Sequence, residues 1–217
     1  MKLQGIGEKS VIKIILYDLD GVLVNACDWH YESLNRALSD ICGFKIDRKD
    51  HEETYNGLPT RSKLELMISK NLIVKEDASK IWKLKQTYTE DTIKDLASID
   101  EEKILIHKIT KRMGISSMCV TNSIRHTAML MLENTGQLDL LSGIVSNEDV
   151  ICPKPDPEGY SIGMKVLTSA PEETLIIEDS DVGYAAAKAS GAHVARVKDA
   201  SEVTLDLVCK SIIKYNG

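Results

Sequence analysis

The sequence lacks the cysteine pattern that a disulfide framework or a zinc site would need. No two cysteines form a Cys-x-x-Cys pair, and the number of cysteines is odd. The five cysteines are widely spaced along the chain, at Cys27, Cys42, Cys119, Cys152 and Cys209. Reduced thiols are the default for such a set, and they are typical of the cytoplasm. We therefore expect a cytoplasmic protein without structural disulfides.

Long apolar runs are also missing. A membrane-spanning helix needs about 20 consecutive apolar residues, and no stretch of this chain is that long. Residues 1–10 are polar and hold no apolar core of a signal peptide. Internal repeats and low-complexity tracts are absent as well. We therefore expect no membrane partner.

An excess of positive charge is the third absence. The chain has 27 Lys and Arg against 33 Asp and Glu, which gives a formal net charge of −6. A nucleic-acid binder usually shows a basic face, so we expect no nucleic-acid partner. An anionic substrate stays possible, because a bound cation can invert the local field. The length of 217 residues fits one large domain, or one domain that carries a small insertion.

Short apolar runs are present, and they are typical of buried strands. Amphipathic helical patterns separate the last four of them, over residues 101–113, 123–134, 156 onward and 182–190. This alternation predicts an α/β fold with a doubly wound parallel sheet. The predicted strands are Val11–Tyr17, Ser117–Thr121, Gly143–Val145, Thr174–Ile177 and His193–Val197.

The segment over residues 28–98 has almost no strand-like runs. Helical patterns cover Trp29–Ser39, Arg61–Lys70 and Asp77–Leu96, with breaks at Gly43 and residues 56–59. We therefore expect a small helical cap domain of residues 28–98, inserted into a core domain of residues 1–27 and 99–217. A cap over the strand ends could exclude water from a site beneath it.

Two acids end the first predicted strand, in a run from Ile14 to Val24 that is otherwise apolar. Asp18 and Asp20 lead from this run into a turn at Gly21. An unpaired buried charge is strongly disfavoured, and ligands of open α/β sheets bind at the carboxyl ends of the strands. The pair therefore indicates a cation or a reaction there. The alternative is a polar strand end that caps a turn.

Two further motifs follow other predicted strands or lie in their loops. Thr121-Asn122-Ser123 opens a predicted helix, where hydroxyls and backbone N–H groups can hold a phosphate; a helix N-cap is the alternative. Lys154 lies in a loop with three prolines and could neutralise phosphate charge. For Lys154 the alternative is a solvated surface lysine.

A second pair of acids follows the apolar run 175–177. Glu178 and Asp179 are oxygen ligands of the kind that Mg²⁺ prefers. The alternative is that one of these acids caps the next helix.

The four motifs together resemble the haloacid dehalogenase superfamily of phosphotransferases. The matching residues are DLDGVLV at 18–24, TNS at 121–123, KPDPE at 154–158 and EDSDVGYAAAKASGA at 178–192. The pattern is similar to the subfamily with a small helical cap, which includes β-phosphoglucomutase and phosphoglycolate phosphatase. The resemblance implies a Rossmann-like core with an inserted cap and a phosphoric monoester hydrolase activity.

The resemblance also implies a role for each core residue. Asp18 would attack phosphorus and form an aspartyl-phosphate. Asp20 would act as general acid and base; dehalogenases of the superfamily lack this second aspartate, so Asp20 favours phosphoryl transfer. Mg²⁺ would be held by Asp18, Asp179, Glu178 and the backbone carbonyl of Asp20.

The remaining core residues would contact the phosphoryl group. Thr121 and Asn122, with Ser123 beside them, would hydrogen-bond its oxygens. Lys154 would balance the charge of the nucleophile and the transferring group.

Three cap residues resemble the substrate-binding cations of the family. His30 follows Asp18 by twelve positions, Arg61 follows a predicted loop, and Lys85 lies near a third basic position with Lys83 as a rival. The alternatives are a helix-surface histidine and an ordinary solvated stripe of lysines. We expect His30, Arg61 and Lys85 to bind the substrate.

Two departures from the family's pattern bear on the reaction. Asn25-Ala26 stands where the family often has Asp-Ser or Asp-Thr, and this weakens a mutase assignment. Gly183 stands where many phosphatases have another aspartate. We predict a Mg²⁺-dependent phosphatase that acts on a small phosphorylated metabolite, with a sugar phosphate as the expected class. The alternatives are a β-phosphoglucomutase-like mutase and a non-catalytic phospho-ligand binding protein. We expect a monomer or a weak homodimer.

Overall fold

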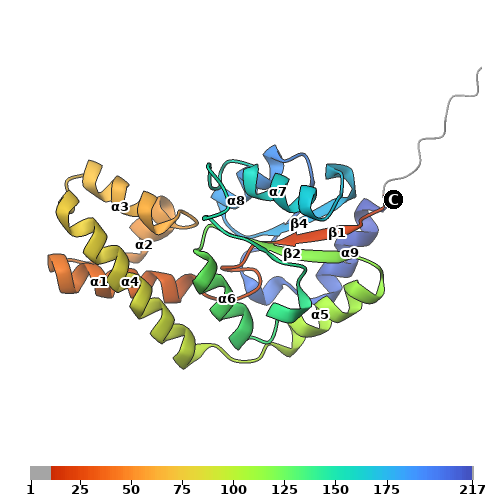
Figure 1. The fold of residues 1–217 in the computed structure, drawn as a ribbon, viewed down its shortest axis with the longest axis horizontal. Coiled ribbons are helices and arrows are strands. Elements are labelled where there is room, and N and C mark those ends of the chain that lie inside the picture. The colour runs from red at the N-terminus through yellow and green to blue at the C-terminus, as the bar shows by residue number, and fades with distance from the viewer. Residues whose placement is uncertain (1–10, 217) are drawn as a thin grey trace, which may run out of the picture.

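The computed structural model describes residues 11–216, and its centre is a five-stranded parallel sheet. The strand order is β3-β2-β1-β4-β5, and every neighbouring pair is parallel. Helices cover both faces of the sheet (Figure 1), so the predicted doubly wound α/β fold is confirmed. The strands are β1 (Ile14–Tyr17), β2 (Ser116–Val120), β3 (Ile144–Val145), β4 (Thr174–Glu178) and β5 (His193–Arg196).

The alternation of side chains along β1 explains the two layers. Ile15 and Tyr17 face a core shared with helices α5 (Glu101–Arg112), α6 (Arg125–Asn134) and α9 (Leu205–Tyr215). Ile14 and Leu16 face a second core shared with α7 (Glu158–Val166) and α8 (Asp181–Ala189). Because both faces of β1 are buried, its sequence is a continuous apolar run rather than an alternating one.

Several predicted boundaries shift by a few residues in the structure. β1 begins at Ile14 rather than Val11, whose side chain is 52% exposed. Helix α6 begins at Arg125, so residues 121–123 form a loop ahead of the helix. Helix α9 and three short 3₁₀ helices are additions to the predicted elements. The 3₁₀ helices are η2 (Leu138–Leu140), η3 (Pro171–Glu173) and η4 (Ala200–Glu202).

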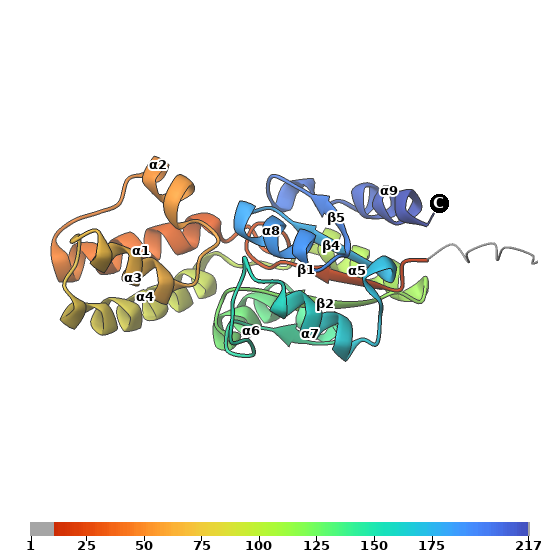
Figure 2. The ribbon, with the colours of Figure 1, turned by 90° about the horizontal axis from the view of Figure 1, so that it is seen from above.

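The helices of residues 27–96 stand to one side of the sheet (Figures 1 and 2). They enclose their own apolar cluster, in which Leu38, Tyr55, Met67 and Ile81 are fully buried. The long elements are α1 (Cys27–Cys42), α3 (Thr60–Ser69) and α4 (Lys75–Leu96); Gly43, with φ of 72°, ends α1. We keep residues 28–98 as the proposed cap domain and residues 1–27 and 99–217 as the proposed core domain.

One helical stretch of this region was not predicted. Helix α2 (Arg48–Asp50) continues into a π-helical turn, η1 (His51–Tyr55). Asp47 begins it, because its side chain accepts a hydrogen bond of 2.7 Å from the backbone N–H of Asp50. The turn buries His51 and Tyr55.

Across residues 11–216, the structure has no helix that is both long enough and apolar enough to cross a lipid bilayer.

Candidate active site

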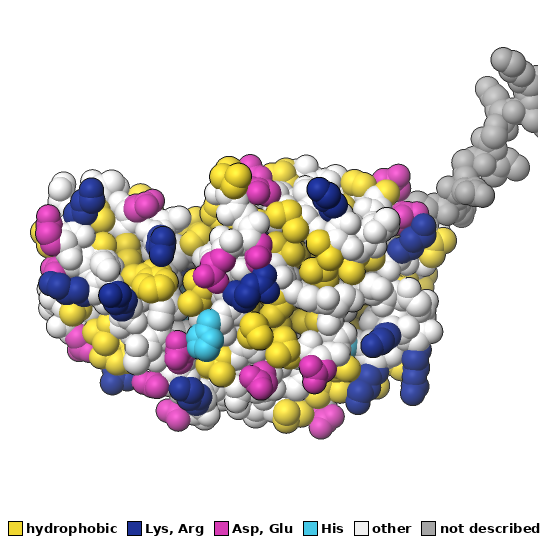
Figure 3. Space-filling model, viewed as in Figure 1, with side chains coloured by type: hydrophobic (Ala, Val, Ile, Leu, Met, Phe, Trp, Pro, Cys, Tyr) yellow, Lys and Arg dark blue, Asp and Glu magenta, His cyan; other side chains and the backbone are white. Residues whose placement is uncertain are grey.

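The predicted site residues meet at the carboxyl ends of the central strands. β1 is the central strand, with β2 and β3 on one side of it and β4 and β5 on the other. The strand order therefore reverses at β1. Asp18 follows β1 at this switch point, where open α/β sheets bind ligands. A cavity of about 390 Å³ opens there, and the molecular outline is hollowed between the cap helices and the core (Figure 3). Its lining includes Asp18, Asp20, His30, Arg61, Lys85, Thr121, Asn122, Ser123, Lys154 and Asp179.

Lys154 pairs with two of the acids. Its Nζ donates to Asp18 Oδ1 at 2.5 Å and to Glu178 Oε1 at 3.3 Å. Burial opposes the charged form of Lys154, but Asp18 and Glu178 hold its pKa well above the usual value. The alternative of a solvated loop lysine is therefore wrong, because the side chain of Lys154 is only 5% exposed.

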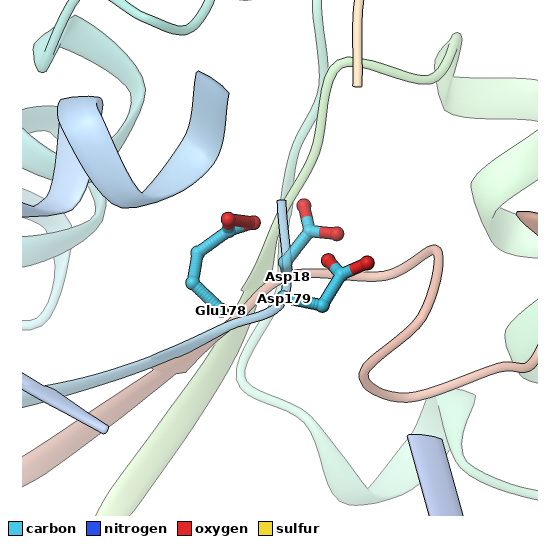
Figure 4. Close-up of side chains that lie close together, drawn as sticks. All are labelled: Asp18, Glu178 and Asp179. Carbon is cyan, nitrogen blue, oxygen red and sulfur yellow. The ribbon is translucent and has the colours of Figure 1, made fainter. Parts of the chain in front are cut away.

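Asp18, Glu178 and Asp179 form a cluster that one lysine does not neutralise. Oxygen atoms of the three side chains lie within 4.8 Å of one another, at the ends of two adjacent strands (Figure 4). Burial raises the pKa of Asp18 and, well above its usual value, that of Glu178. Burial, Asp18 and Asp20 raise the pKa of Asp179 to about 7.

The donor set fits a hard cation such as Mg²⁺. Asp179 Oδ1 is buried and has no hydrogen-bond partner among the residues that the structure describes. A buried carboxylate oxygen without a partner is costly, and Mg²⁺ prefers oxygen ligands. Asp20 was also predicted as a ligand; its side chain lies outside this cluster, and its backbone carbonyl stays the predicted ligand.

Asp20 is held by one residue of the cap and one of the core. Its Oδ1 lies 2.9 Å from His30 Nε2, and its Oδ2 accepts a hydrogen bond of 2.8 Å from Ser123 Oγ. Burial alone would raise the pKa of Asp20, but His30 and Ser123 lower it to about 2. Ser123, predicted to bind substrate, thus contacts the predicted acid/base directly.

Lys85 continues this series of hydrogen bonds into the cap. Its Nζ lies 3.0 Å from His30 Nδ1. Burial and Lys63 lower the pKa of Lys85 to about 7. When Lys85 is protonated it can only donate, so Nδ1 of His30 accepts and Nε2 carries the proton that His30 donates to Asp20. His30 and Lys85 have side chains that are largely buried, whereas Lys83 is exposed. The surface alternatives for His30 and Lys85 are therefore wrong, and Lys85 rather than Lys83 faces the cavity.

The loop over residues 121–123 joins the core to the cap. Asn122 Nδ2 donates to the carbonyls of Gly57 at 2.8 Å and Lys154 at 3.2 Å, and Asn122 Oδ1 accepts from Lys154 N at 3.0 Å. The side chain of Asn122 is therefore engaged with the protein, and its backbone N–H is the group left to meet a phosphate. Thr121 Oγ1 accepts from Ser123 N at 2.9 Å, so the Thr121 hydroxyl can still donate to a ligand.

Arg61 lies at the cap side of the cavity. Its guanidinium is 5.3 Å from the centre of the Trp82 ring, and the residue is exposed. In the described part of the chain, Arg61 makes no hydrogen bond to the core, so it is free to meet a substrate.

Comparison with known proteins identifies the family. Residues 15–197 match the sequence profile described as haloacid dehalogenase-like hydrolase. The chain belongs to this family. Pyrophosphatase PpaX of Anoxybacillus flavithermus is 27% identical over 193 residues, which cover 86% of this chain and 83% of that protein. A plasmid-encoded phosphoglycolate phosphatase of Cupriavidus necator is 28% identical over 194 residues, or 85% and 80% of the two chains.

The fold is also that of solved structures of this family. A β-phosphoglucomutase from Clostridium difficile superposes with a TM-score of 0.81 and 18% identity, over 94% of this chain and 99% of that one. The predicted resemblance and the predicted class of enzyme, a haloacid dehalogenase-like hydrolase, are confirmed.

Two glycines of this hydrolase leave room for the acids. Gly21 has φ of +89°, and a Cβ there would overlap the carboxyl group of Asp179. A Cβ at Gly183 would overlap the carboxyl group of Glu178. The departure at Gly183 thus has a physical reason, because any side chain there would displace Glu178 from Lys154.

Lys63 and His51 also line the cavity of this hydrolase, and neither was predicted from the sequence. Lys63 is 7% exposed and His51 is 3% exposed. A signal for Lys63 exists, because it lies four positions before the buried Met67 on the apolar face of α3. His51 lies in the π-helical turn, which no sequence pattern indicated.

Proposed function

We propose that this chain is a Mg²⁺-dependent phosphatase that hydrolyses a small phosphorylated metabolite, with a sugar phosphate as the expected class. One observation carries the proposal. Asp18 and Asp20 line the same cavity, and each has its own hydrogen-bond partners. Asp18 is paired with Lys154, and Asp20 is bonded to His30 and Ser123. Relatives named pyrophosphatase and phosphoglycolate phosphatase support the same reaction class.

In the first step, a carboxylate oxygen of Asp18 attacks phosphorus while the bond to the leaving oxygen breaks. Asp20 gives its proton to that oxygen, and the phosphoryl group stays on Asp18 as an acyl phosphate. The pKa of about 2 favours the carboxylate form of Asp20. An arriving phosphate dianion raises the pKa of a neighbouring acid, so substrate binding favours the protonated form that this step needs.

In the second step, Asp20 removes a proton from water, and the water oxygen attacks phosphorus. The bond to Asp18 breaks, and inorganic phosphate leaves. The pKa of about 2 suits Asp20 for this role, because the carboxylate is then the resting form.

Asp18, Asp179 and Glu178, with the backbone carbonyl of Asp20, would hold Mg²⁺. When bound, Mg²⁺ supplies positive charge that lets the anionic carboxylate approach the anionic phosphate. Lys154 supplies further positive charge at Asp18. The Thr121 hydroxyl and the backbone N–H of Asn122 would donate to the phosphoryl oxygens.

Phosphate release from a panel of phosphorylated metabolites, with Mg²⁺ and with a chelator, tests the proposal. We expect release that requires Mg²⁺ and that Asp18→Asn abolishes. Conversion of β-glucose 1-phosphate to glucose 6-phosphate without net release would assign a mutase instead. No turnover of any compound would favour a binding protein on this fold.

A further inference from the structure

Lys63 is a buried cation that the proposed reaction does not use. It lies on α3 of the cap, is 7% exposed and lines the cavity that holds Asp18 and Asp20. Within residues 11–216, its ammonium group makes no hydrogen bond and no ion pair. A largely desolvated charge without a partner is disfavoured, and Lys63 lines the cavity, so a partner that enters the cavity is indicated.

None of the neighbouring side chains that the structure describes is hydrogen-bonded to Lys63. His30 and Lys85 are cationic or neutral, and they are already joined to each other and to Asp20. His51, a third neighbour, is buried and has an unpartnered Nδ1. All three groups line the cavity with Lys63, and burial together with the charge of Lys63 lowers the pKa of each of them. Asp20 already accepts from His30 and Ser123.

Lys63 lies on the side of the cavity toward which the leaving group of the substrate would extend. Asp20 protonates the leaving oxygen in the proposed reaction, so the rest of the leaving group must extend from Asp20 toward the cap. Lys63 and Asp20 line the same cavity, where burial lowers the pKa of Lys63 to about 8 and the charge of Asp20 opposes that shift. A negative group carried by the leaving group would therefore meet the Lys63 ammonium inside the cavity.

We propose that Lys63 is a specificity residue that binds a second anionic group, a carboxylate or a second phosphate, on the leaving group. The inference rests on the proposed phosphatase function and narrows its substrate to phosphomonoesters that carry a second negative charge. Lys63 would discriminate against neutral leaving groups, because binding them would leave the buried ammonium unpaired.

Matched pairs of substrates test this inference. Each pair has the same backbone with and without the second charge: phosphoglycolate and 2-hydroxyethyl phosphate, 3-phosphoglycerate and glycerol phosphate, fructose 1,6-bisphosphate and fructose 6-phosphate. We expect kcat/KM of the wild-type protein to favour the charged member of at least one pair. Lys63→Met should lower kcat/KM for that member by about 30-fold or more. The loss for the neutral member should be about threefold or less.

Two further variants separate charge from packing. Lys63→Arg keeps the charge and should retain most of the preference. Lys83→Met removes an exposed lysine of the same cap and should leave both members unchanged. Equal losses on both members of a pair in Lys63→Met would overturn the inference.

The wild-type protein alone can also overturn the inference, by showing no preference in any pair, even if a variant fails to fold. The proposed phosphatase function fails separately, if no member of any pair and no p-nitrophenyl phosphate is hydrolysed.

Discussion

A methyl group at position 183 should disable the metal site while leaving the fold intact. The Cβ of Gly183→Ala would overlap the carbon and both oxygens of the Glu178 carboxyl group. Glu178 is fully buried, and its carboxyl group accepts hydrogen bonds from Lys154 and Ser180. It therefore cannot move without loss of these contacts. Overpacking of a well-packed interior costs about 1–3 kcal/mol. Disturbing a group that orients a metal ligand typically lowers metal affinity by about 10–100-fold.

Gly163→Ala is the matched control. Both glycines lie inside helices, and alanine is favoured over glycine there by about 1 kcal/mol. The Cβ at Gly163 would meet the apolar side chains of Leu16, at 3.1 Å, and Val120, at 3.4 Å. Activity of both variants is measured over a range of Mg²⁺ concentrations, and thermal unfolding is measured alongside. We expect Gly183→Ala to need about 10–100-fold more Mg²⁺ and Gly163→Ala to behave as the wild type. Unchanged Mg²⁺ dependence in Gly183→Ala would refute Glu178 as part of the site.

Three further predictions follow from the same geometry. Because the folded-state pKa of Asp179 is raised from 3.8 to about 7, the stability of the metal-free protein should fall as the pH rises through that window. The rise in melting temperature on adding Mg²⁺ should therefore be larger at high pH, and Asp179→Asn should weaken this dependence, leaving the part that the raised pKa values of Asp18 and Glu178 contribute. Lys154→Met leaves Asp18 and Glu178 unpaired, so unfolding titrations without Mg²⁺ should show a loss of about 3–5 kcal/mol; a stable variant would contradict the buried pairing. Arg61→Ala should lower kcat/KM for the best metabolite about tenfold but leave p-nitrophenyl phosphate unchanged, because an exposed cap residue reads only the leaving group. Equal losses on both substrates would place Arg61 outside substrate recognition.

The core was predictable because buried parallel strands leave a direct trace in the sequence. Every residue of β1 and β4 is buried, so β1 and residues 175–177 of β4 are continuous apolar runs, and the acids that follow these runs stand out. The strand ends were less certain. Val11 is apolar like its neighbours, but it is exposed and lies outside β1.

The cap was harder to predict, because its helices carry buried lysines. In α4, the buried residues Ile81, Lys85, Thr89 and Ile93 repeat every four positions, and this repeat distinguishes Lys85 from Lys83. Lys63 follows the same rule on α3, but a lysine on an apolar face is easily taken for a surface residue.

Contacts between distant segments left no sequence signal. Asn122 donates to Gly57, which lies 65 positions earlier, and His30 reaches both Asp20 and Lys85. These bonds depend on how the cap sits over the core. As a result, Ser123, His30 and Lys85 were predicted as substrate ligands, whereas the structure joins them to Asp20 directly or through one another.

The central claim is that Asp18 carries the phosphoryl group during turnover. The most direct test is to quench the reaction of the best substrate, reduce the protein with borohydride and sequence the peptides by mass spectrometry. Borohydride converts an aspartyl-phosphate to homoserine, so we predict homoserine at position 18 only when substrate is present. Modification at another acid, or none at position 18 while phosphate is being released, would contradict the account.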